Sequence, residues 1–135
     1  MATSKDFVAC HAGPPRSKTS VQSLIAIRDN PSLARELVWN RLRRTGRPDG
    51  YAKGDVKKLR IALGAEKDTP FVVSHTPLSR TDAIWTDAGE IPGHHVMFSA
   101  NPDKLGVFIR DQRTLIPLEY PGEPLIEFVN GLKVD

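Results

Sequence analysis

The fold is set by two stretches of similar form, Phe71-Val72-Val73-Ser74-His75-Thr76-Pro77 and, near the N-terminus, Phe7-Val8-Ala9-Cys10-His11-Ala12-Gly13. Each begins with a short apolar run and continues into a turn that contains proline or glycine. An uninterrupted apolar run bounded by turn residues is typical of a buried strand. The sequence therefore predicts two buried strands, and each of them has a histidine at its end.

The sequence between these two strands has helical patterns. A first short helix is expected after a cap at Thr19 or Ser20. Ser32 can cap a second helix, whose end the pattern leaves open within residues 39–44. Asp55 is the expected cap of a third helix, which follows a loop rich in glycine. Two or three helices therefore precede the second buried strand.

The C-terminal half changes in character and is predicted to be mostly β-structure. Short apolar runs alternate there with Asn, Asp, Gly and Pro, as in successive strands joined by turns. The expected strands cover residues 96–98, 106–110, 115–119 and 125–129. Helices between buried strands, followed by strands in succession, favour an α/β fold with a mixed sheet over a helical bundle.

Length and composition agree with one folded domain over residues 1–135. Hydrophobic residues make up 39% of the chain and charged residues 26%, so a core can be buried. No apolar run is long enough to span a membrane, and Met1–Asp6 lacks the apolar region of a signal peptide, so we expect a soluble cytoplasmic protein without a membrane partner. The single cysteine, Cys10, excludes an internal disulfide and a cysteine-cluster zinc site.

The basic residues are concentrated over residues 35–67, although the net charge of the chain is only +3. Such a cluster is most often the solvated face of helices and a loop. The functional alternatives are phosphate binding and a nucleic-acid-binding module that uses the basic helices, for instance as a helix-turn-helix.

The two strand-end histidines are the strongest candidates for chemistry. Ligands in α/β sheets gather at the carboxyl ends of strands, where His11 and His75 are both expected. Two imidazoles on neighbouring strands can share one divalent ion, but they cannot complete its ligand set. A single histidine in such a place is more often a hydrogen-bonded structural residue. Of His94 and His95, at most one can face any site, because adjacent strand residues point to opposite faces.

Four blocks of residues in this order resemble the C-terminal half of the calcineurin-like metallophosphatases. They are the two histidine stretches together with Val38-Trp39-Asn40-Arg41 and Phe98-Ser99-Ala100-Asn101. The resemblance is closest to the bacterial and phage branch of the serine/threonine phosphoprotein phosphatases. It covers most of the chain and implies the second half of the metallophosphatase β-sandwich.

The resemblance also implies roles for individual residues. His11 and His75 match two ligands of one ion in a dinuclear site that holds manganese, iron or zinc. Arg41 matches the arginine that holds the substrate phosphoryl group, and Arg47 is a second candidate for phosphate binding. The implied activity is hydrolysis of phosphate monoesters, with a phosphorylated molecule as the substrate.

The sequence departs from the family pattern in two ways. Ser74 and Ala12 stand where family members commonly have glycine. The earlier family blocks Asp-x-His, Gly-Asp-x-x-Asp-Arg-Gly and Gly-Asn-His-Asp/Glu have no counterpart. We therefore expect a fragment, a split-gene half or a degenerate relative that is inactive alone and that pairs with an N-terminal half or a partner chain. A non-catalytic interaction remnant is the remaining alternative.

Overall fold

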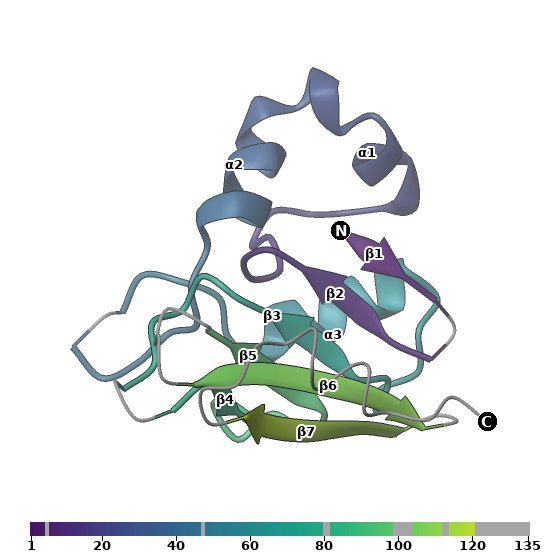
Figure 1. Ribbon diagram of the computed structural model, residues 1–135. Helices are drawn as coiled ribbons and strands as arrows, with labels where there is room; N and C mark the ends of the chain where they lie inside the picture. Colours follow the sequence, from purple (N-terminus) through teal and green to yellow (C-terminus); the bar gives the residue numbers. More distant parts are fainter. Residues whose placement is uncertain (5, 47, 80–81, 99–103, 112–113, 121–135) are drawn as a thin grey trace.

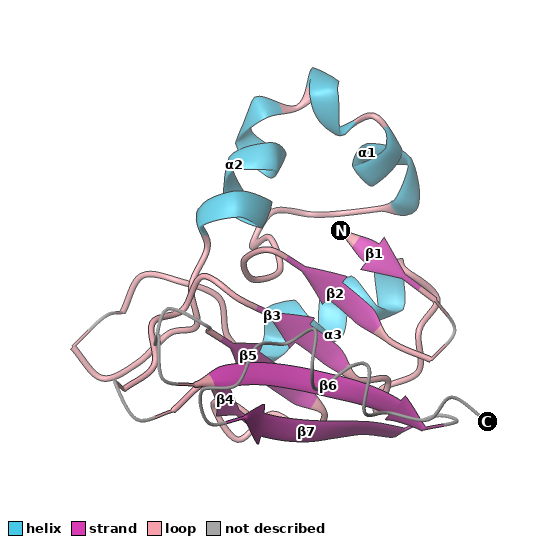
Figure 2. Ribbon diagram, in the orientation of Figure 1, coloured by secondary structure: helices cyan, strands magenta, loops and turns pink. Residues whose placement is uncertain are grey.

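The structure is a computed structural model that describes residues 1–4, 6–46, 48–79, 82–98, 104–111 and 114–120. It is an α/β arrangement of a mixed five-stranded sheet, a two-stranded sheet and three α-helices (Figures 1 and 2). The predicted fold class is confirmed at this level. The expected strand over residues 125–129 lies outside the described residues.

The two strands that precede His11 and His75 pair with each other inside the five-stranded sheet. Its order is β1 (Ala2–Thr3), β2 (Val8–Cys10), β3 (Phe71–Val73), β5 (His94–Met97) and β4 (Ile84–Trp85). Strands β2, β3 and β5 are parallel, whereas β1 and β4 pair antiparallel at the two edges. The carboxyl ends of β2 and β3 therefore lie at the same edge of the sheet.

Register gives each face of the sheet a different role. Val8, Phe71 and His94 are aligned across β2, β3 and β5, and all three are buried. Their neighbours Val72 and His95 point to the opposite face, because side chains alternate along a strand. The continuous apolar runs of β2 and β3 predict that both faces are covered by other elements.

Helix α3 (Lys53–Ala62) covers the first of these faces (Figure 1). Val56 and Leu59 are buried on it and join Phe71 and Val73 in the main core. The prediction that Asp55 is the N-cap of this helix is wrong, because the cap lies three residues earlier. Ala52 is the cap residue, and the carboxylate of Asp55 accepts its backbone N–H at 3.0 Å from inside the first turn.

Helices α1 (Val21–Ile25) and α2 (Pro31–Trp39) lie beyond the β1–β2 edge of the sheet, joined by a 3₁₀ turn. Ser20 caps α1, as predicted, through a reciprocal pair of hydrogen bonds with Ser23. The predicted second helix is present as α2, but its predicted cap is wrong, because Asn30 and not Ser32 is the cap residue. The Asn30 side chain accepts the Leu33 N–H at 3.1 Å, and proline is favourable directly after a cap.

The other face of the sheet is covered by a hairpin of β6 (Leu105–Asp111) and β7 (Thr114–Tyr120) (Figures 1 and 2). The His95 ring lies 5.3 Å from the Phe108 ring, measured between centroids. Glu119 accepts the backbone N–H groups of Ala83 and Ile84 at 2.9 and 3.0 Å. Within the described residues, no helix has the length and apolar character needed to cross a membrane.

Candidate metal and phosphate site

His11 and His75 lie together at the carboxyl edge of the sheet. His11 follows β2 directly, and His75 follows β3 by two residues. The Ser74 N–H donates to the His11 carbonyl at 3.0 Å, which extends the β2–β3 ladder beyond the strands. The two ring centroids are 5.2 Å apart. The predicted proximity of the two histidines is therefore confirmed, although their role as ligands stays a prediction.

His75 occupies a tight three-residue turn. The Thr76 N–H donates to the Ser74 carbonyl at 2.7 Å, and His75 between them has a φ of 59°. A hydrogen bond between residues i and i+2, with a positive φ at the residue between them, is the pattern of the rare and strained γ-turn. Non-glycine residues are held in such conformations mostly at functional sites. Trp39 contacts His75 edge-on, with centroids 5.2 Å apart, while its own side chain is 62% exposed.

Arg41 reaches this edge because α2 ends at Trp39. The Asn40 side chain donates to the Pro14 carbonyl at 2.7 Å, and the Leu42 N–H donates to the Thr76 hydroxyl at 3.3 Å. The chain at residue 41 is thereby tied to the turn that carries His75. Gly50 is required for this path, because a Cβ there would overlap the Arg41 carbonyl and its φ is 139°.

The electrostatics of the site favour a neutral His75. Burial lowers the pKa of His75, and the positive charges of Arg41 and His11 lower it further. The Nε2 of His75 and the Nε of Arg41 are buried and have no hydrogen-bond partner among the residues that the structure describes. One nitrogen of His75 and one of Arg41 are thus buried polar atoms that the described residues leave without a hydrogen bond.

A pocket of about 360 Å³ lies beside Arg41, and its lining combines basic and hydroxyl side chains with apolar ones. Arg44 and Thr76 contribute to its wall together with Arg41. The Arg44 guanidinium donates to the Pro77 carbonyl at 2.9 Å and lies 5.1 Å from the centroid of the Trp85 ring. Sequence reasoning missed Arg44 and Thr76 as site residues. Only the basic cluster around Arg44 and the position of Thr76 directly after His75 were available as signals.

The other sequence candidates lie elsewhere or outside the described residues. Arg47 and residues 99–101 belong to the undescribed segments. His94 is fully buried, with its ring nitrogens 3.0 Å from the Tyr51 hydroxyl and 3.1 Å from the Ala88 carbonyl. His95 points to the hairpin on the opposite face. The prediction that these two histidines face opposite sides of the sheet is confirmed.

The residues present fit part of a metal site. Two imidazoles bound to one tetrahedral ion at about 2.0–2.1 Å have ring centroids about 5 Å apart. The observed His11–His75 separation agrees with that value, and no described residue forms a hydrogen bond with Nε2 of His75. No group of three or more His, Cys, Asp or Glu side chains gathers within the described part of the chain. The described residues therefore bring two imidazoles together and add no third candidate ligand to them.

Comparison with protein-family models, curated proteins and solved structures found no match for this chain. A function for this chain therefore rests on its sequence motifs and on the arrangement of His11, His75 and Arg41. The resemblance to metallophosphatases remains a prediction.

Proposed function

We propose that this chain contributes part of the active site of a metal-dependent phosphoesterase that hydrolyses phosphate monoesters. The carrying observation is the meeting of His11, His75 and Arg41 at one sheet edge, with unpartnered nitrogens on His75 and Arg41 among the described residues. Strand-end histidines beside an arginine have the chemistry that binds a divalent cation and a phosphoryl group together.

In this proposal His11 and His75 hold one divalent cation, which is manganese, iron or zinc. A cation held there would polarise the phosphoryl oxygens and lower the pKa of a water molecule. The guanidinium of Arg41 is planar and permanently charged, so it can hold two phosphoryl oxygens and offset the charge that develops on them. Arg44 and Thr76 line the adjoining pocket, where they would orient the substrate.

The proposal includes a second source of ligands. Catalytic zinc sites commonly use three protein ligands, and hydrolysis by two ions needs more. His11 and His75 supply two. We infer that the carboxylate and amide ligands come from an N-terminal half or from a partner chain that packs against this sheet edge.

The nucleic-acid alternative has less support. The basic segment spans the end of α2 and all of α3, but α2 ends at Trp39 and α3 begins at Lys53. A helix-turn-helix joins its helices by a turn of about 3–4 residues. The connection here is longer and includes Arg41 of the candidate site.

The metal part of the proposal is tested by titrating the chain with Zn²⁺ while the histidine ring resonances are followed by NMR. We expect shifts at His11 and His75, whereas His94 and His95 stay unchanged and serve as internal controls. His75→Ala should remove the shift at His11. A shift at His94 or His95 alone, or none at any ring, would overturn the proposal.

The phosphate part is tested on the zinc-loaded chain with inorganic phosphate and ³¹P NMR. Arg41→Ala should weaken phosphate binding about tenfold, the scale of a lost charge-assisted hydrogen bond, and leave zinc binding unchanged. Arg35→Ala, on the exposed side of α2, is the matched control. Equal losses of zinc and phosphate binding would mean that Arg41 is structural.

A further inference from the structure

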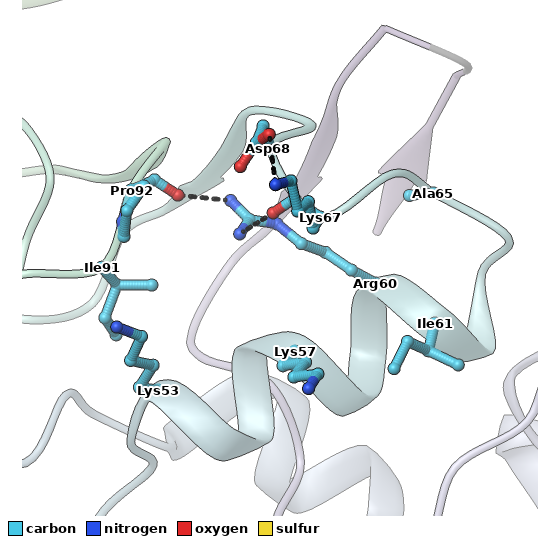
Figure 3. A pocket seen from close by; sticks show the side chains of 9 residues that line it. All are labelled: Lys53, Lys57, Arg60, Ile61, Ala65, Lys67, Asp68, Ile91 and Pro92. Atoms are coloured by element: carbon cyan, nitrogen blue, oxygen red, sulfur yellow. Dashed lines mark hydrogen bonds and ion pairs between the residues drawn. The ribbon is translucent and has the colours of Figure 1, made fainter.

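A second pocket, of about 380 Å³, lies on α3 near the amino ends of β3 and β5, away from the histidine edge (Figure 3). Side chains from α3 form one side, and the segments that enter β3 and β5 form the other. The lining residues are Lys53, Lys57, Arg60, Ile61, Ala65, Lys67, Asp68, Ile91 and Pro92.

The interior of this pocket is mainly apolar. Ile91 lines it from the segment before β5, is buried, and belongs to the main core. Ile61 is 65% exposed, although it is a large aliphatic side chain on a short helix. Ala65 and Pro92 complete the apolar surface. A ligand with an apolar body would cover these side chains and remove Ile61 from water, which is favourable in proportion to the area buried.

The rim carries more positive than negative charge, and Asp68 is the carboxylate among the described residues that line it. Lys53 and Lys57 are one helical turn apart on α3, and neither forms an ion pair within the described part of the chain. Lys67 and Asp68 form a distant, exposed pair at 3.9 Å. Like charges at this helical spacing are mildly destabilising, so an anion between Lys53 and Lys57 would relieve their repulsion.

Arg60 adds a buried cation to one wall. Arg60 is only 5% exposed. Its guanidinium extends from α3 and donates to the carbonyls of Lys67 and Pro92 at 2.7 and 3.0 Å (Figure 3). These acceptors are neutral, and the Nε of Arg60 has no partner among the described residues. Burial lowers the pKa of Arg60, while Asp68 opposes that shift. A buried guanidinium without a carboxylate in hydrogen-bond contact favours an anion nearby.

We propose that this pocket binds a small organic anion with an apolar body. The head group is a carboxylate, phosphate or sulfonate that lies at Lys53 and Lys57, and the body covers Ile61, Ala65 and Pro92. The pocket and the histidine site are at opposite ends of the parallel strands, so this binding does not require a metal or the phosphoesterase activity.

The test uses two fluorescent probes that share an aromatic body. One is 8-anilinonaphthalene-1-sulfonate, which is an anion, and the other is neutral N-phenyl-1-naphthylamine. We expect the sulfonate probe to bind the intact chain more tightly than the neutral probe does. In ¹H–¹⁵N spectra, the protein amides that shift when the sulfonate binds should lie in α3 and in residues 65–68 and 91–93. Equal affinities, or shift changes mapped to another surface, would overturn the proposal.

Variants separate the charge from the apolar surface. The double variant Lys53→Gln/Lys57→Gln should weaken the sulfonate probe about threefold to tenfold, as expected for two exposed charges, and leave the neutral probe unchanged. Lys58→Gln is the matched control, because Lys58 is paired with Asp55 at 3.5 Å and does not line the pocket. Ala65→Phe should fill the pocket and weaken both probes. Equal effects of the double variant and of Lys58→Gln would contradict the proposal.

Discussion

An added methyl group at Gly13 would collide with a buried aromatic ring. A Cβ at Gly13 would overlap the ring of Tyr51, which is fully buried in the core. We therefore expect Gly13→Ala to lower the free energy of unfolding by about 2–4 kcal/mol, the cost of forcing a buried ring out of place. Urea unfolding followed by circular dichroism measures the change.

Gly54 provides the matched control for that substitution. It lies in the first turn of α3, and a Cβ there would meet nothing within 4 Å. Gly54→Ala should raise the free energy of unfolding by about 0.5–1 kcal/mol, because alanine loses less conformational entropy in a helix. A Gly13→Ala protein as stable as the wild type would show that the Tyr51 ring has room to move.

His94 makes stability depend on pH. Burial lowers its pKa from 6.5 to about 4. Between these values the unfolded chain binds more protons than the folded chain, so stability falls as the pH decreases from about 6.5 to about 4. The full effect is about 3 kcal/mol, from 1.36 kcal/mol for each pKa unit.

The measurement compares the wild type with His94→Gln by urea unfolding over the same pH range. The stability advantage of the wild type should shrink as the pH decreases, because only His94 is removed while the other titrating groups are shared. A difference that stays constant with pH would contradict a depressed His94 pKa.

At the scale of elements, the hairpin β6–β7 is attached to the sheet through Glu119. Its carboxylate accepts two backbone N–H groups of the segment at β4 and contacts Lys104 at 3.2 Å. These N–H groups, that of Ile84 foremost, lower the pKa of Glu119. Glu119→Ala should reduce the free energy of unfolding by about 1–2 kcal/mol, because the buried Ala83 N–H loses its acceptor.

Glu66→Ala is the control for the hairpin, since Glu66 is an exposed acid in a turn after α3. It should change the stability by less than about 0.5 kcal/mol. Faster amide hydrogen exchange over residues 105–111 in Glu119→Ala, and not in Glu66→Ala, would locate the effect at the hairpin. Equal exchange in both variants would show that apolar contacts alone hold it.

The sequence predicts those helices and strands that are specified by residues close together in the chain. The apolar runs of β2 and β3 are of this kind, and so is the cap at Ser20, one of the two predicted candidates. The α2 cap was misplaced because proline at the first helical position favours Asn30 over Ser32. Strands β1 and β4 were missed, since two-residue edge strands are defined by their pairing partner and carry no periodicity of their own.

The candidate site shows the same division. The strand-end rule brings His11 and His75 together, and that placement needed only the apolar runs before them. The contact that ties Thr76 to this edge is the N–H of Leu42, which is distant in sequence, so local pattern does not reveal it. His94 was ambiguous for the same reason, because its partner Tyr51 is contributed by another segment.

For the whole molecule, we predict that the isolated chain does not hydrolyse p-nitrophenyl phosphate, even with excess manganese. Two imidazoles give an ion only part of its ligand shell, and no third candidate ligand joins them in the described residues. The assay is run on the purified chain and on His75→Ala. Robust turnover that His75→Ala abolishes would show that the chain completes its site alone or by self-association.

The parallel pairing of β2 with β3 also determines when the two histidines meet during folding. Antiparallel neighbours are joined by a tight turn, but β2 and β3 are separated in the chain by α1, α2 and α3. Contacts between segments distant in the chain pay a large loop-closure entropy and tend to form late. A cation that bridges His11 and His75 would stabilise the β2–β3 contact, which we expect to form late in folding. It would therefore lower the unfolding rate and leave the refolding rate nearly unchanged.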